Sequence, residues 1–267
     1  MLTRQNVADF LRDNGYNDSV ICLHSSYKSL GEVEGGPEAV IDGFLDAGCT
    51  LLVPAFYYLS VTAPTGRNYF RNGIDYANKT FDPRPFTGAA DQIDPSMGII
   101  PRKVVERPET VRSSHPCNGF AALGPRAREL MEGQDYLNVY SPYKRIFESD
   151  SEAWIFMLGT ALTSCTPIHF AEERSGREPF RRWAVAGDKT VEVQAGSCSD
   201  GFSNFENELV GMDERFSLGE SVLRVFAFRA FVEAVTEIIL TNPRVSACDN
   251  PRCLRCPDMI AGGPILR

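Results

Sequence analysis

The sequence predicts an α/β fold, and three observations carry that prediction. Residues 20–24 and 50–53 are apolar runs of buried-strand length, and a helical pattern that opens at Pro37 lies between them. Strand, helix and strand at this spacing predict a parallel βαβ unit. A third apolar run, residues 154–158, closes on Gly159 and is the most strand-like segment of the chain.

The other elements follow from caps, prolines and apolar spacing. The helix over residues 217–240 is expected because Ser217 and Glu220 match a capping box, with Val222, Phe226, Ala230 and Val235 among its inward candidates. The remaining expected elements are a helix over 3–14, a helix over 97–107 that Pro101 limits or kinks, a strand-like run at 120–124, helices opening at Pro125 and Ser141-Pro142, and a hairpin of 183–185 with 190–193.

Length and composition fit one domain. The chain has 267 residues, of which 43% are hydrophobic, and we expect residues 1–267 to form a single domain. Residues 55–95 read as an irregular insertion and residues 241–267 as a cysteine-containing C-terminal segment. No apolar run has the length of a membrane span, and residues 1–7 lack the features of a signal peptide, so we predict a cytoplasmic protein with no membrane partner. A net charge of −8 argues against nucleic-acid binding.

The cysteines suggest a reducing compartment. Cys22, Cys49 and Cys165 lie in or beside apolar runs and read as small buried residues. Cys253 and Cys256 have the spacing of a zinc knuckle, and Cys248 is a third candidate ligand. Because no fourth ligand is visible nearby, we predict reduced thiols rather than a metal. The candidates for a fourth ligand are Cys198, Asp249 and Asp258.

Residues 166–173 carry the strongest chemical pattern. Thr166 is a good N-cap and Pro167 fits the first helical position, which places His169 third in a short helix. Glu172 and Glu173 then lie three and four residues on, beside the imidazole on one helix face. The helix N-terminus favours a neutral imidazole, and a carboxylate stabilises the imidazolium once a proton arrives. The alternative interpretation is a solvated first turn in which acids are common.

Two polar loops predict ligand contacts. Residues 25–36 hold serines, Lys28 and glycines directly after a strand, where α/β sheets bind ligands. Residues 112–116 place a cation, two hydroxyls and His115 in one loop. An ordinary polar turn is the alternative for the first loop. For the second, the alternative is that His115 caps a backbone group.

Taken together, three separated motifs give this chain a close resemblance to the antibiotic N-acetyltransferase family, best known for the aminoglycoside 3-N-acetyltransferases. Order and spacing agree over roughly residues 1–240, but the chain departs from the family at 117–119 and matches poorly at 55–95. The motifs are 24–31 with Val33, Gly35, Gly36, Pro37 and 52–54; then Met97-Gly98, 111–116, 121–124 and Ser141-Pro142; then Leu158-Gly159 and 166–172.

The resemblance implies a three-layer α/β/α domain with a mixed central sheet and an acetyl-CoA-dependent acyltransferase linked to antibiotic resistance. It implies that His169 is the base and that Glu172 orients it. For the oxyanion we expect backbone amides or serine hydroxyls near Ser113 to be the donors. We expect Glu173, His115 and Asn118 to contact the amine substrate. The expected coenzyme A contacts are Ser25, Ser26, Tyr27, Lys28, Ser29, Val33, Gly35, Arg112, Ser113 and Ser114.

Three functions remain open at this point. The first is N-acetylation of an aminoglycoside or related polyamine. The second is biosynthetic acyl transfer to another small amine. The third is a coenzyme A-binding protein without catalysis. The His169–Glu172 pair argues against this third function, because a protein without catalysis has no need of a polarised base. A homodimer is one possible assembly of the chain.

Overall fold

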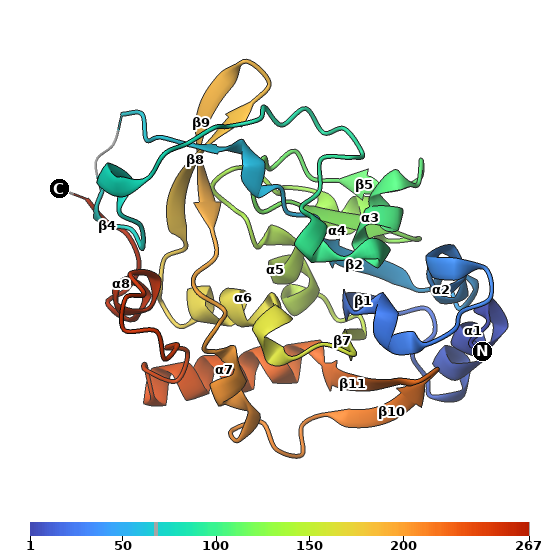
Figure 1. Ribbon diagram of the computed structural model, residues 1–267. Helices are drawn as coiled ribbons and strands as arrows, with labels where there is room; N and C mark the ends of the chain where they lie inside the picture. Colours follow the sequence, from blue (N-terminus) through green and yellow to red (C-terminus); the bar gives the residue numbers. More distant parts are fainter. Residues whose placement is uncertain (67–68, 267) are drawn as a thin grey trace.

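A mixed β-sheet with strand order β10-β11-β7-β1-β2-β6-β5 forms the centre of the molecule (Figure 1). The computed structural model describes residues 1–66 and 69–266, so residues 67 and 68 of the predicted insertion and residue 267 lie outside the described residues. Strand β1 pairs in parallel with β2 and β7, and the flanking pairs are antiparallel. The predicted βαβ unit is confirmed as β1, α2 and β2. The strands are β1 (Val20–Ser25), β2 (Thr50–Pro54), β5 (Val111–Arg112), β6 (Phe120–Leu123), β7 (Ala153–Leu158), β10 (Glu214–Leu218) and β11 (Ser221–Ala227).

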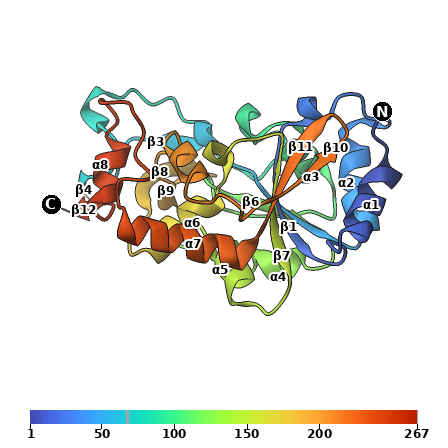
Figure 2. The same ribbon diagram turned by 90° about the horizontal axis from the view of Figure 1, so that it is seen from below.

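Helices cover both faces of this sheet, which gives three layers (Figure 2). Alternation along β1 explains the two cores, because Ile21 and Leu23 face one helical layer while Val20 and Cys22 face the other. The first layer is α1 (Arg4–Asp13), α2 (Gly36–Asp46) and α3 (Ile99–Glu106). The second layer is α4 (Ala127–Met131), α5 (Ser141–Glu148), α6 (Pro167–Arg174) and α7 (Phe228–Thr241).

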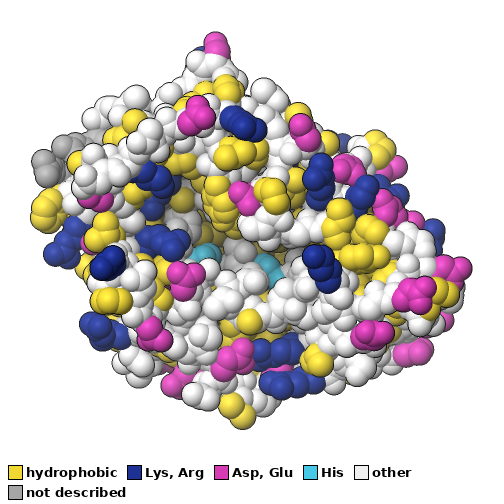
Figure 3. All heavy atoms as spheres, in the orientation of Figure 1, with side chains coloured by type: hydrophobic (Ala, Val, Ile, Leu, Met, Phe, Trp, Pro, Cys, Tyr) yellow, Lys and Arg dark blue, Asp and Glu magenta, His cyan; other side chains and the backbone are white. Residues whose placement is uncertain are grey.

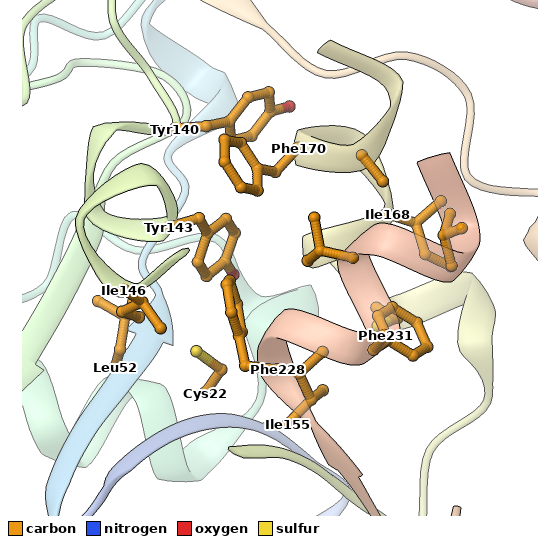
Figure 4. Close-up of a cluster of buried hydrophobic side chains, with 14 of the residues drawn as sticks. Cys22, Leu52, Tyr140, Tyr143, Ile146, Ile155, Ile168, Phe170, Phe228 and Phe231 are labelled. Carbon is orange, nitrogen blue, oxygen red and sulfur yellow. The ribbon is translucent and has the colours of Figure 1, made fainter. Parts of the chain in front are cut away.

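The second core fixes the position of α6, the helix that carries His169. Tyr143 from α5, Ile168 from α6 and Phe228 from α7 converge on Cys22 and Ile155 of the sheet (Figure 4). All five side chains are buried. Replacing a buried aromatic side chain such as Phe228 by alanine lowers the free energy of unfolding by about 3–5 kcal/mol. This packing therefore holds α6 firmly against the sheet.

The helix predicted from the Ser217–Glu220 spacing is wrong in its first half. Residues 214–227 form the antiparallel pair β10 and β11, and the helix begins only at Phe228. The alternation of buried and exposed residues favours a strand here, since Leu223 and Val225 are buried and pair with β7, with β10 on the other side of β11. Consequently the predicted inward residues Val222 and Ala230 are exposed, whereas Phe226 and Val235 are buried as predicted.

A second, smaller set of strands stands beside the main sheet. Strands β8 (Phe180–Ala186) and β9 (Lys189–Ala195) form the predicted hairpin, and β3 (Val61–Thr62) adds to it. Strand β4 (Tyr69–Arg71) pairs with β12 (Ile265–Leu266) near α8 (Arg255–Ile260), as Figure 1 shows. The predicted insertion, which holds β3 and β4, and the C-terminal segment, which holds α8 and β12, are the two accessory segments, and both lie beside the hairpin. Within the described residues, no helix has the length and apolar character needed to cross a membrane.

Candidate active site

A cavity of about 1380 Å³ opens at the carboxyl ends of β1 and β2. Ligands in α/β sheets bind at this edge, because loops after neighbouring strands meet there. Ser25 ends β1, Pro54 ends β2, and Thr160 follows β7; all three line the cavity. Figure 3 shows this hollow, with imidazole groups at its floor and basic side chains around it.

Helix α6 brings His169 to the cavity. Pro167 lies in the first helical turn and His169 is third, as predicted. The capping prediction is wrong, because Thr166 has helical backbone angles and its side chain makes no capping hydrogen bond. Thr166 instead lines the cavity beside His169.

Glu172 and Ser197 hold the imidazole of His169 by one nitrogen. His169 Nδ1 lies 3.0 Å from Glu172 Oε2 and 3.1 Å from Ser197 Oγ. Ser197 Oγ also donates to Glu172 Oε2 at 2.5 Å. A carboxylate only accepts, so the shared contact favours a proton on Nδ1 and leaves Nε2 as the basic nitrogen. This tautomer suits a general base.

The second oxygen of Glu172 is held by an arginine. Arg177 Nη1 donates to Glu172 Oε1 at 3.1 Å, and the side chains of Arg177 and Glu172 are only 6% and 3% exposed. Burial lowers the pKa of Arg177, and the charge of Glu172 opposes that change. Arg177 also donates to Ser246 Oγ at 2.9 Å and to Pro243 O at 2.6 Å. Both oxygens of the carboxylate are thereby fixed.

Aromatic rings and a glycine set the plane of the imidazole. The Phe202 ring lies 4.8 Å from the His169 ring, and Tyr140 stacks at 6.3 Å with an angle of 13°. Burial raises the pKa of Tyr140 well above its usual value, so its hydroxyl stays protonated. Gly196 passes so close that a Cβ there would meet Tyr140 Oη at 2.9 Å and His169 Nε2 at 3.2 Å.

The predicted site residues divide into two groups. Those that line the cavity are Ser25, Ser26, Tyr27, Lys28, Asn118 and His169. Glu172 lies buried behind His169. The others lie away from the cavity lining, namely Ser29, Val33, Gly35, Arg112, Ser113, Ser114, His115 and Glu173.

The loop at residues 112–118 is held by its own polar groups. Arg112 donates to Ala89 O at 2.6 Å and lies over the Phe86 ring. His115 Nδ1 accepts from the backbone N–H groups of Cys117 and Asn118 at 3.2 and 3.0 Å. Burial lowers the pKa of His115 to about 4. The alternative in which His115 caps backbone groups is therefore the one the geometry supports.

Sequence reasoning missed several residues of the site. No sequence pattern pointed to Ser197 or Arg177 as site residues, because they come into contact with Glu172 only in the folded chain. The start of α3 also lines the cavity, through Met97, Gly98 and Arg102. The Met97-Gly98 pair belongs to the second motif of the family resemblance, and Gly98 has the positive φ of 87° that glycine adopts easily.

The fold and the site define an α/β/α protein with a buried histidine–glutamate pair at a large cavity. Residues 22–239 match the family described as aminoglycoside 3-N-acetyltransferase, and the chain belongs to that family. Aminoglycoside N(3)-acetyltransferase III of Salmonella sp is 30% identical over 196 residues, which are 69% of this chain and 65% of the relative. Type IX of Micromonospora chalcea is 28% identical over 183 residues, or 64% of this chain and 62% of the relative. The chain thus spans just under two thirds of these curated relatives.

Solved structures confirm the predicted fold. The apoenzyme of aminoglycoside acetyltransferase AAC(3)-IVa superposes with a TM-score of 0.76 at 21% identity, over 95% of each chain. The structure described as AAC-IIIb binary with CoASH has a TM-score of 0.68 at 20% identity, over 90% of this chain and 96% of that one. At these identities the likeness establishes the three-layer architecture.

Proposed function

We propose that this chain is an acetyl-CoA-dependent N-acetyltransferase that acetylates an amine of an aminoglycoside-like acceptor. One observation carries the proposal: in a member of this family, Glu172 holds His169 at the wall of a cavity large enough for two substrates. A protein that only bound coenzyme A would have no use for an oriented base. Both accessory segments reach this cavity through Lys79 and Arg255, so we also propose that residues 1–267 work as one domain.

The cavity offers a fitting place for the coenzyme at one end. Lys28 and Arg102 supply positive charge there, and no side chain caps the N-terminus of α3, whose first backbone N–H groups would favour an anion. Ser25, Ser26 and Tyr27 line the same end. The phosphates of coenzyme A would lie against this basic end, and its thioester would point toward His169.

In the proposed mechanism, transfer is direct. Bound acetyl-CoA supplies the acetyl group as a thioester, whose C–S bond breaks as the new C–N bond forms. His169 Nε2 takes the proton that the attacking amine must lose, and Glu172 stabilises the resulting imidazolium. The thiolate of coenzyme A is the leaving group, and the proton on His169 passes to it or to solvent. Ser197 and Arg177 keep Glu172 in place. The oxyanion role expected for Ser113 is not carried forward, because Ser113 Oγ accepts from the His115 N–H away from the cavity.

A free-thiol release assay tests the proposal. Purified protein is mixed with acetyl-CoA and a panel of aminoglycosides and simple polyamines. Release that depends on the acceptor supports acetyl transfer. Coenzyme A binding without release for any amine would contradict the proposed acceptor class. Light scattering of the same sample tests the homodimer, and fractionation of the producing cells tests the cytoplasmic location.

A second acceptor class is favoured by charge. Besides Lys28 and Arg102, the cavity is lined by Lys79, Arg182 and Arg255, and Asp94 is the one carboxylate among the described lining residues. A polycation would meet repulsion there, whereas a small amine that carries an anionic group would be attracted. Biosynthetic acyl transfer to such an amine is therefore the alternative. Release with an amino-sugar phosphate, lost in Lys79→Ala, would favour it over the aminoglycoside.

A further inference from the structure

The fold gathers four cysteines that the sequence keeps apart. Cys198 follows β9, whereas Cys248, Cys253 and Cys256 belong to the C-terminal segment. Their four sulfur atoms all lie within 4.8 Å of one another. The Cys256 sulfur lies 3.5 Å from that of Cys253 and 3.6 Å from that of Cys248.

These distances match a tetrahedral metal site better than disulfides. Zn–S bonds of about 2.3 Å in a tetrahedron place the sulfurs about 3.8 Å apart. A disulfide would require about 2.05 Å, and all four cysteines are free. The described fold therefore supplies the fourth ligand, Cys198, which was only one of several candidates in the sequence.

The surroundings suit thiolates. The backbone N–H of Cys248 donates to the Cys256 sulfur at 3.3 Å. Cys198 and Cys256 are buried, while Cys248 and Cys253 are partly exposed and leave a path for an ion.

We propose that Cys198, Cys248, Cys253 and Cys256 bind one Zn²⁺ in a structural tetrathiolate site. This replaces the sequence-based expectation of reduced thiols. Four thiol ligands with no place for water fit a closed structural site rather than a catalytic one. On binding, each thiol loses its proton to solvent and the ion stays Zn²⁺, so no electron moves.

The ion would tie the C-terminal segment to the active site. Cys198 directly follows Ser197, which contacts Glu172 and His169. On the other side, Asn204 donates to Val245 O and Ala247 O, and Arg177 donates to Ser246 Oγ. Zinc would thus lock the wall that carries Ser197 against the segment that carries Ser246.

Metal content tests the proposal directly, without reference to acetyl transfer. Protein purified without chelator is analysed for zinc and iron beside Cys253→Ser and the matched control Cys49→Ala, whose cysteine is buried far along the chain from the cluster. We expect about one zinc per chain in the wild type and control, and loss of zinc in Cys253→Ser. Absence of zinc, equimolar iron, or zinc retained by the variant would overturn the proposal.

Thiol counting keeps the test valid if the variant fails to fold. Native wild-type protein is titrated with a thiol reagent before and after a strong chelator. We expect chelation to release zinc and to expose the four cluster thiols together. Thiols that react equally without the chelator, or a shortfall of two thiols in denatured protein that indicates a disulfide, would show that the cluster holds no ion.

Discussion

Arg177 forms a buried ion pair with Glu172 of helix α6, and it also donates to Pro243 O and Ser246 Oγ in the C-terminal part of the chain. The polar atoms of the ion pair lie 3.1 Å apart, and the other oxygen of the same carboxylate lies 3.0 Å from His169 Nδ1. A substitution at Arg177 should therefore affect His169 through Glu172, although Arg177 does not contact His169 itself.

Replacing Arg177 by Met should destabilise the protein by about 3 kcal/mol, because Glu172 then keeps a buried charge without its partner. Chemical denaturation measures this change. Lys144→Met is the control, since Lys144 and Glu148 are both exposed at 4.0 Å and such a pair contributes little. Equal midpoints for the two variants would contradict the role of the ion pair.

Glu172→Gln should lower kcat about 10²-fold, because a neutral amide no longer stabilises the imidazolium of His169. Coenzyme A affinity should stay the same, since Glu172 lies behind the histidine. Steady-state kinetics with isothermal titration measure both quantities. The control is Glu233→Gln on the exposed side of α7. A loss seen only in coenzyme A affinity would argue against an orienting role.

Gly196→Ala should displace the imidazole. The added methyl group would lie 2.9 Å from Tyr140 Oη and 3.2 Å from His169 Nε2, so a ring must shift to make room. Tyr140 is buried, whereas His169 borders the cavity, so the imidazole is the ring that we expect to move. We expect a fall in kcat of about 10-fold or more with little change in fold, because misplacing a base costs rate steeply. Gly176→Ala, where nothing lies near the added atom, serves as the control for the substitution itself. A crystal structure of Gly196→Ala with an unmoved His169 would refute this account.

Burial of His115 predicts acid sensitivity. Its pKa is lowered to about 4, against about 6.5 when unfolded, so the unfolded chain binds more protons between these values. Stability from this group is complete above pH 6.5 and declines as the pH falls toward 4, by up to roughly 3 kcal/mol. His115→Asn, which still accepts a hydrogen bond, should flatten the dependence. His24, whose pKa is lowered to about 3 by burial, leaves a residual slope. An unchanged slope would contradict the prediction.

The elements that depend on neighbouring residues in the sequence were predicted correctly. The β1–α2–β2 unit and the third helical position of His169 follow from apolar runs and a proline, and both are confirmed. The helix predicted from the Ser217–Glu220 spacing was wrong in its first half, because β11 pairs with β7, which lies 65 to 73 residues earlier in the chain. Sheet pairing outweighs a capping pattern there.

Contacts made only on folding escaped prediction for the same reason. Ser197 meets Glu172 across 25 residues, and Cys198 meets Cys248 across 50 residues. Spacing cannot show such neighbours. The family resemblance predicted His169 as the base and Glu172 as its orienter, and the structure added Ser197 and Arg177, which contact Glu172.

The most direct test compares thiol release by wild-type protein and His169→Ala with acetyl-CoA and an accepted amine. The account predicts a loss in kcat of about 10³-fold in the variant, with coenzyme A affinity unchanged in calorimetry. Near-normal turnover by His169→Ala would contradict the central claim that this histidine is the base.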